Sequence, residues 1–199
     1  MVFLDVAVVA LVLGKLLGGR FIALADTPIA GKYFAFAAIG LQMVAFPWSF
    51  LPWTTSSDTS RALWLVSFAL LIVMLLRNKA LLGAMIIAAG LVSNLVAVVA
   101  NHGLMPVLPS ALHTAGTHYH VHNNSIQVVQ PNLGFLVDRW GAPHWLPLAN
   151  VFSVGDVLIA VGTVVAIVAA MKAPTAAEAW DGGGANLRLY TGTVPATTN

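Results

Sequence analysis

The chain has 199 residues, of which 59% are hydrophobic and 8% are charged, and its formal net charge is +2. Ordinary soluble domains carry about 25% charged residues, so this composition predicts an integral membrane protein. The small and scattered positive charge excludes a nucleic-acid-binding surface. Because the chain has no cysteine, disulfides and thiolate metal sites are excluded, and any metal would need imidazole or oxygen ligands.

Five apolar segments approach the length of about 20 residues that a helix needs to cross a bilayer. They cover residues 2–17, 32–51, 60–76, 80–100 and 153–171. We therefore expect an all-α membrane protein with about five transmembrane helices in a single transmembrane domain over residues 1–171. A long outer loop over residues 101–152 interrupts this domain, and a tail rich in Gly and Thr follows over residues 172–199.

The basic residues predict the orientation of the spans, because Lys and Arg near span ends are retained in the cytoplasm. Seven of the nine fall on one side of the membrane, and Arg61 and Arg139 fall on the other. The seven are Lys15, Arg20, Lys32, Arg77, Lys79, Lys172 and Arg188. The N-terminus is therefore expected outside and the tail in the cytoplasm. For Arg20, a role in a site is the alternative to charge retention.

Small residues recur at four-residue spacing in the last two spans. They are Ala89, Ser93 and Ala97 in the fourth span and Gly162, Ala166 and Ala170 in the fifth. Small side chains at this spacing let helices approach closely in lipid, so these two spans are expected to pack together. Inside the spans, Gln42 and Asn94 are expected to form hydrogen bonds between helices, with ligand contact as the alternative.

The long loop contains all six histidines of the chain. Residues 109–116 predict a short helix, with a Ser near its start and a Gly at its end. His118, His120 and His122 then alternate with other residues, which in an extended strand places three imidazoles on one face. Imidazole is a common metal ligand, so one interpretation is a site for a divalent transition metal. The other interpretation is a strand face exposed to water.

Asp156, at the start of the fifth span, also has two interpretations. Ser153 and Asp156 have the spacing of a helix-capping box, and the helix dipole favours an anion in the first turn. Alternatively, an ionisable group at this depth indicates a functional site, with His102 or Asn101 as partner. His102 could also ligate a haem or chlorophyll metal. The candidate cofactor-binding residues are thus His102, Asn94, Asn101 and Asp156. No nucleophile elbow, phosphate loop or paired-carboxylate motif predicts a catalytic residue.

Four sequence features resemble a known family. They are Gly18-Gly19-Arg20 with Leu24-Ala25, Asn94 with Ala100-Asn101-His102-Gly103-Leu104-Met105-Pro106-Val107, His122-Asn123, and Asn150-Val151-Phe152-Ser153-Val154-Gly155-Asp156-Val157-Leu158-Ile159. They are similar to the bacterial membrane proteins grouped as domain of unknown function 5317. The resemblance covers most of residues 1–171 and implies a multi-pass protein of the bacterial cytoplasmic membrane, without implying an activity. The chain departs from the family pattern at His102, where that pattern has a second Gly.

Three features favour a non-enzymatic function: the small number of candidate catalytic residues, the small-residue faces of the helices, and the tail. We expect an accessory or scaffold subunit of a larger membrane complex, whose partners are the lipid bilayer and other protein subunits. The alternative is a metal- or ion-binding membrane protein, an enzyme or a transporter, that uses the outer histidines and Asp156. The metal content of the purified protein distinguishes the two hypotheses.

Overall fold

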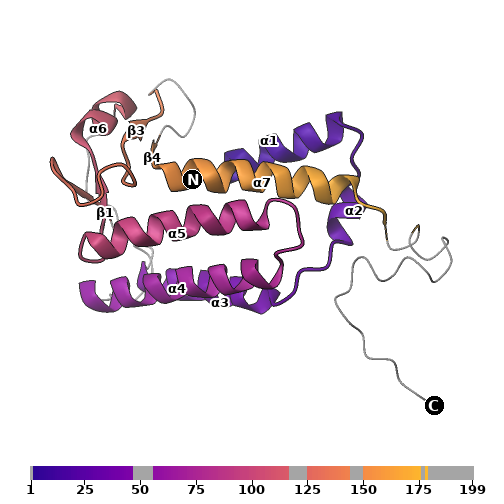
Figure 1. The fold of residues 1–199 in the computed structure, drawn as a ribbon, viewed down its shortest axis with the longest axis horizontal. Coiled ribbons are helices and arrows are strands. Elements are labelled where there is room, and N and C mark those ends of the chain that lie inside the picture. The colour runs from indigo at the N-terminus through magenta and orange to yellow at the C-terminus, as the bar shows by residue number, and fades with distance from the viewer. Residues whose placement is uncertain (1, 47–55, 117–124, 144–149, 176–177, 179–199) are drawn as a thin grey trace, which may run out of the picture.

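The computed structural model describes residues 2–46, 56–116, 125–143, 150–175 and 178, and these are mostly helical (Figure 1). The helices are α1 (Val2–Leu16), α2 (Phe21–Ala25), α3 (Lys32–Ala45), α4 (Ser57–Arg77), α5 (Ala84–Ala100), α6 (Pro109–Ala115) and α7 (Val154–Lys172). The short helix expected over residues 109–116 is α6. The predicted strand containing His118, His120 and His122 lies outside the described residues.

The described residues also contain four short strands. The all-α prediction did not include these strands. They are β1 (Met105–Val107), β2 (Ser125–Gln127), β3 (Trp140–Gly141) and β4 (Val151–Phe152). β1 pairs with β2 in parallel, and β3 pairs with β4 in antiparallel fashion. We call residues 101–116, 125–143 and 150–152 the cap, because Figure 1 shows α6, β1, β3 and β4 gathered at one end of the long helices.

Two of the helices, α4 with 21 residues and α7 with 19, are long and apolar enough to cross a bilayer. The expected spans over 32–51 and 80–100 are shorter in the structure. α3 ends at Ala45, because Pro47 disfavours helical geometry at the residue before it. α5 begins only at Ala84, since Gly83 has a left-handed backbone with φ 88°. α3 is therefore roughly 21 Å long and α5 roughly 26 Å long.

The long helices pack side by side in the order α3, α4, α5, α7, α1. No extensive contact joins α1 to α3 among the described residues, so the arrangement is open. α3 and α4 are linked by a hydrogen bond of 3.0 Å from Gln42 Nε2 to Ser67 Oγ, which confirms Gln42 as an interhelical residue. α2 lies near the end of α7, opposite the cap (Figure 1).

The expected contact between the fourth and fifth spans is confirmed, since α5 and α7 make the most extensive helix contact. Their backbones meet at glycines. A Cβ atom on Gly83 would lie 2.2 Å from Gly162 O, and one on Gly90 would lie 2.5 Å from Gly155 O. Gly162 belongs to the predicted face, but the predicted α5 residue Ala89 is exposed. The backbone of α5 approaches α7 at Gly90 and at its N-cap Gly83, whereas the predicted residue Ala97, seven residues after Gly90 and on the same side of the helix, is fully buried.

Candidate functional site

The first turn of α7 is held by the predicted capping box. Ser153 has the extended backbone of an N-cap residue. Its Oγ accepts a hydrogen bond of 3.1 Å from the Asp156 amide, and Asp156 Oδ2 accepts one of 2.9 Å from the Ser153 amide. These bonds satisfy two backbone amides that would otherwise lack partners at a helix start. The capping interpretation of Asp156 is therefore confirmed.

Asn94 connects this capping box to α5. Its Nδ2 donates a hydrogen bond of 2.9 Å to Asp156 Oδ1, and its Oδ1 lies 2.9 Å from Ser153 Oγ. Both side chains are buried, with exposed fractions of 7% for Asn94 and 0% for Ser153. The approach depends on Gly155, because a Cβ atom there would lie 1.9 Å from Asn94 Oδ1. Asn94 thus forms the interhelical hydrogen bond that its position predicted.

Asp138 is a second carboxyl group near this cluster, and the sequence did not single it out. Its amide donates to Pro106 O at 3.1 Å, and its carbonyl accepts from the Leu108 amide at 2.9 Å. The next residue, Arg139, donates its amide to Phe152 O at 3.3 Å, directly before Ser153. The backbone of the cap therefore places Asp138 beside the start of α7.

Asp138 is a buried residue, with an exposed fraction of 8%. Burial, and to a smaller extent the negative charge of Asp156, together raise the pKa of Asp138 from 3.8 to about 7. One sequence signal could have found it: Asp138 is the only Asp or Glu among residues 101–152. The sequence does not show that this acid is buried, so the signal indicates a special role only together with the structure.

Asn101 and His102 were predicted partners of Asp156, and the structure instead places them in the turn that ends α5. Asn101 Nδ2 donates to Ala97 O at 2.7 Å and to Asn132 O at 2.9 Å, and Asn101 Oδ1 accepts from the Asn132 amide at 2.9 Å. Asn101 therefore fastens the cap to the helix end. His102 is exposed and has a left-handed backbone with φ 57°. Among the described residues, the hydrogen bonds to the Asp156 carboxylate come from Asn94 and Ser153 instead.

The predicted metal ligands His118, His120 and His122 fall outside the described residues, so their geometry stays a prediction. Within the described part of the chain, no three His, Asp or Glu side chains are grouped as a metal site would require. Asp156 uses both carboxylate oxygens as hydrogen-bond acceptors inside the capping box and to Asn94.

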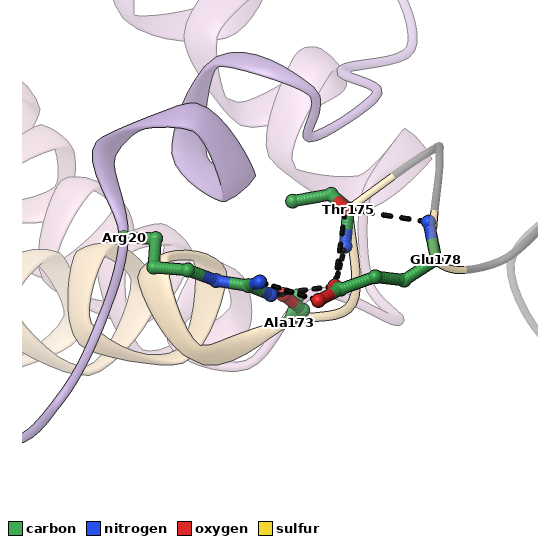
Figure 2. A network of polar contacts seen from close by, with 4 residues as sticks. All are labelled: Arg20, Ala173, Thr175 and Glu178. Atoms are coloured by element: carbon green, nitrogen blue, oxygen red, sulfur yellow. Dashed lines mark hydrogen bonds and ion pairs between the residues drawn. The ribbon is translucent and has the colours of Figure 1, made fainter.

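A second polar network lies at the opposite end of the helices, where Arg20 joins the connection after α1 to the segment after α7 (Figure 2). The Arg20 guanidinium donates to both carboxylate oxygens of Glu178, at 2.5 and 2.6 Å, and its amide donates to Met171 O at 2.7 Å. Glu178 also accepts from the Thr175 amide at 2.9 Å. The hydrogen bonds from Arg20 and Thr175 lower the pKa of Glu178 to about 2. Arg20 is thus a structural link.

A family model described as "Family of unknown function (DUF5317)" matches residues 26–168. The chain belongs to this family. The match contains the four polar residues Asn94, Asp138, Ser153 and Asp156. Two features of the predicted resemblance, at residues 18–20 and 24–25, lie before the matched range. No curated protein and no solved structure matches the chain.

Proposed function

We propose that this DUF5317 protein is a non-enzymatic, multi-pass membrane protein that acts as an accessory or scaffold subunit of a larger membrane complex. The observation that carries the proposal is the open order of the helices, α3–α4–α5–α7–α1. Each edge helix, α1 or α3, has one extensive long-helix neighbour among the described residues. An open arrangement leaves two helix edges on which other subunits can pack.

The apolar side chains of the edge helices support this proposal. α3 exposes Tyr33, Phe36 and Met43, which are 76%, 67% and 52% exposed. These residues recur at spacings of three and seven, so they share one side of the helix. In a bilayer this surface contacts lipid or another apolar helix and has no contact with water. The edges are therefore suited to packing inside a membrane.

The polar side chains inside the long helices also support a structural role, because they form hydrogen bonds between helices. Asn94 bonds to Asp156, and Gln42 bonds to Ser67, so each amide is used to join two neighbouring helices. Interhelical hydrogen bonds of this kind stabilise helix pairs in lipid by roughly 0.6–2 kcal/mol. These amides hold the helices in order and are not presented to a substrate.

The proposed topology has five spans in the bacterial cytoplasmic membrane, the cap outside and the tail in the cytoplasm. Its support is that Arg20 and Lys172 lie at the end of the molecule opposite the cap (Figure 1). The shorter helices fit this topology if they end within the interfacial region or if the bilayer thins locally beside them.

Site-specific photo-crosslinking in the native membrane tests the proposal. A photoreactive residue placed at Phe36 of α3 or Val12 of α1 should give a discrete adduct with a different protein from at least one edge. The matched control is Val73 of α4, which is 40% exposed but belongs to a helix with neighbours on both sides. Lipid adducts alone from both edges would contradict the proposal.

The alternative function, metal or ion binding by the outer histidines with Asp156, makes a different prediction. Purified protein would then contain stoichiometric metal. Replacing His118, His120 and His122 together with Ala would remove it, and binding would weaken as the pH falls through about 6.5, since neutral imidazole is the ligand. Such a result would favour the alternative over the scaffold proposal.

A further inference from the structure

The edge helix α1 has two different sides. On one side it packs on α7, where Ala10 is fully buried and a Cβ atom on Gly14 would collide with Met171 Sδ. Turned away from this contact, α1 lines an apolar groove of about 310 Å³, to which Phe21 of α2 also contributes. The groove residues on α1 are Val8, Leu11, Val12, Lys15 and Leu16.

The dimensions of the groove suit one acyl chain of a lipid. Its residues on α1 follow the spacing of a single helix face, and Val8, Val12, Leu16 and Phe21 are each more than half exposed. Residues 8–16 extend over roughly 12 Å of helix, and one leaflet of the hydrocarbon core is roughly 15 Å thick. The groove therefore has about the depth that one leaflet requires.

Lys15 places a positive charge at the end of this groove. It lies in the last turn of α1 and is exposed. Within the described part of the chain, the two ion pairs join Arg20 to Glu178 and Arg61 to Asp58, so neither uses Lys15. A lysine beside apolar surface keeps its ammonium group at the level of the headgroups. The charge of Lys15 is therefore available to an anionic headgroup, whereas that of Arg20 is engaged by Glu178.

We propose that the groove between α1 and α2 binds one anionic phospholipid, whose acyl chain lies along Val8, Leu11 and Val12 and whose headgroup phosphate contacts Lys15. The inference rests on the membrane placement proposed above, but it is independent of the scaffold role. Basic pockets beside helices on the cytoplasmic side of a membrane are suited to phosphate headgroups. Lys15 is on the side of the molecule that the proposed topology places in the cytoplasm, which agrees with this arrangement.

The extent of the groove favours a lipid over a partner helix. A partner helix would pack along the whole length of α1, whereas the groove covers only residues 8–16, the half that ends beside Lys15. The short helix α2, with Phe21 and Ile22 exposed, lies at the same end of the molecule (Figure 1). A lipid with its headgroup at this level would cover the exposed apolar side chains of both helices.

Native mass spectrometry of the delipidated full-length protein tests the charge requirement. The protein is titrated with phosphatidylglycerol, which is anionic, or with phosphatidylcholine of the same acyl chains, which has no net charge. The wild type should bind one phosphatidylglycerol about fivefold more tightly, the factor expected from one basic residue near a charged headgroup. Lys15→Gln should abolish this preference. The matched control is Lys79→Gln, which removes an exposed lysine from the connection between α4 and α5 and should keep the preference.

Filling the groove tests the position of the acyl chain. Val12→Trp adds bulk without changing the charge and should weaken phosphatidylglycerol binding several-fold, whereas Val73→Trp on α4, also at an exposed position, should not. Equal affinity of the wild type for the two lipids would overturn the proposal. An unchanged preference in Lys15→Gln or unchanged binding in Val12→Trp would also overturn it.

Photo-crosslinking in the native membrane separates this proposal from the scaffold function. A photoreactive residue at Val12 should give an adduct with an anionic phospholipid. Protein adducts alone at Val12 would show that a partner helix fills the groove, and the lipid assignment would be wrong. The scaffold function would in that case be supported, and with a lipid at Val12 it is tested by the adducts from Phe36 on α3, so each proposal can fail without the other.

Discussion

His102 follows α5 with φ 57°, a left-handed conformation that residues with a Cβ atom adopt at a cost of roughly 1 kcal/mol. Gly, in contrast, adopts positive φ readily. The side chain is exposed and takes no part in the cluster around Asp156. The turn after α5 therefore places an exposed residue in a strained conformation at position 102.

Replacing His102 with Gly should stabilise the protein by up to about 1 kcal/mol, because the strained conformation is relieved. Thermal unfolding in detergent measures the change. His102→Ala is the control, since Ala keeps the Cβ atom and should give no gain. A loss of stability in His102→Gly would show that the imidazole makes a contact that outweighs the strain.

The Asn94 side chain should contribute to stability through its bond to Asp156. Asn94→Ala removes the donor to Asp156 Oδ1 and leaves a buried acceptor unpaired, which should cost about 1–3 kcal/mol. Ala97→Ser is a comparison on the same helix that leaves the cluster intact. An unchanged free energy of unfolding for Asn94→Ala would mean that water replaces the amide.

The sequence predicted contacts between neighbouring residues of the chain and missed contacts between distant ones. The spacing of Ser153 and Asp156 was sufficient to predict the capping box, because both partners lie within one helical turn. Asp138 could not be placed beside Asp156 in this way. Its position depends on backbone bonds to Pro106 and Leu108, which are about 30 residues away in the sequence.

The helix pair α5 and α7 is determined by glycines that let the backbones touch. A Cβ atom on Gly155 would lie 2.7 Å from Gly90 O, and one on Gly162 would lie 2.9 Å from Gly83 O. Small-residue spacing correctly predicted that the two helices pack. It did not identify the contact residues of α5, because Gly83 and Gly90 were not in the predicted set and Ala89 lies about 100° around the helix from Gly90. The contact uses Gly90.

Gly155→Ala should therefore destabilise the protein by about 2 kcal/mol or more, since the added methyl group displaces Asn94 or separates the helices. Gly40→Ala on α3 is the matched control. No atom lies within 4 Å of a Cβ there, and Ala is the better helix former, so this variant should be stabilised by roughly 0.5–1 kcal/mol. Equal effects of the two substitutions on the thermal midpoint would argue against the close α5–α7 contact.

The connection between Arg20 and Glu178 should control how firmly the segment after α7 is held. Arg20→Gln should increase proteolytic cleavage after Ala173, and high salt should weaken the wild-type link because the pair is exposed. Since the pKa of Glu178 is lowered to about 2, the link should persist down to acidic pH and be lost as the pH falls through that value. Cleavage at the same rate in wild type and variant would contradict this role.

The whole molecule is an open row of helices with a cap at one end. Hydropathy predicted its helical content, because long apolar segments have few alternatives to the helix. Hydropathy alone could not give the order α3–α4–α5–α7–α1, which depends on glycine contacts and interhelical amides. The end of α3 and the start of α5 were also misplaced, since a Pro at position 47 disfavours helical geometry at the residue before it and Gly83 has a left-handed backbone.

The proposed topology makes a prediction for the whole chain. A reporter that is active only in the cytoplasm should be active when it is fused after Met171 and silent when it is inserted near residue 117, because basic residues concentrate on the tail side. The reverse pattern would place the cap and the predicted histidine segment in the cytoplasm.

Native mass spectrometry after mild extraction from the native membrane tests whether the chain is a subunit of a larger membrane complex, as we propose. We expect the chain in a particle that contains at least one different polypeptide in fixed stoichiometry. The particle should persist when the detergent is exchanged, since apolar helix packing holds it together. A chain that is released consistently as a monomer, with only lipid bound, would contradict the claim.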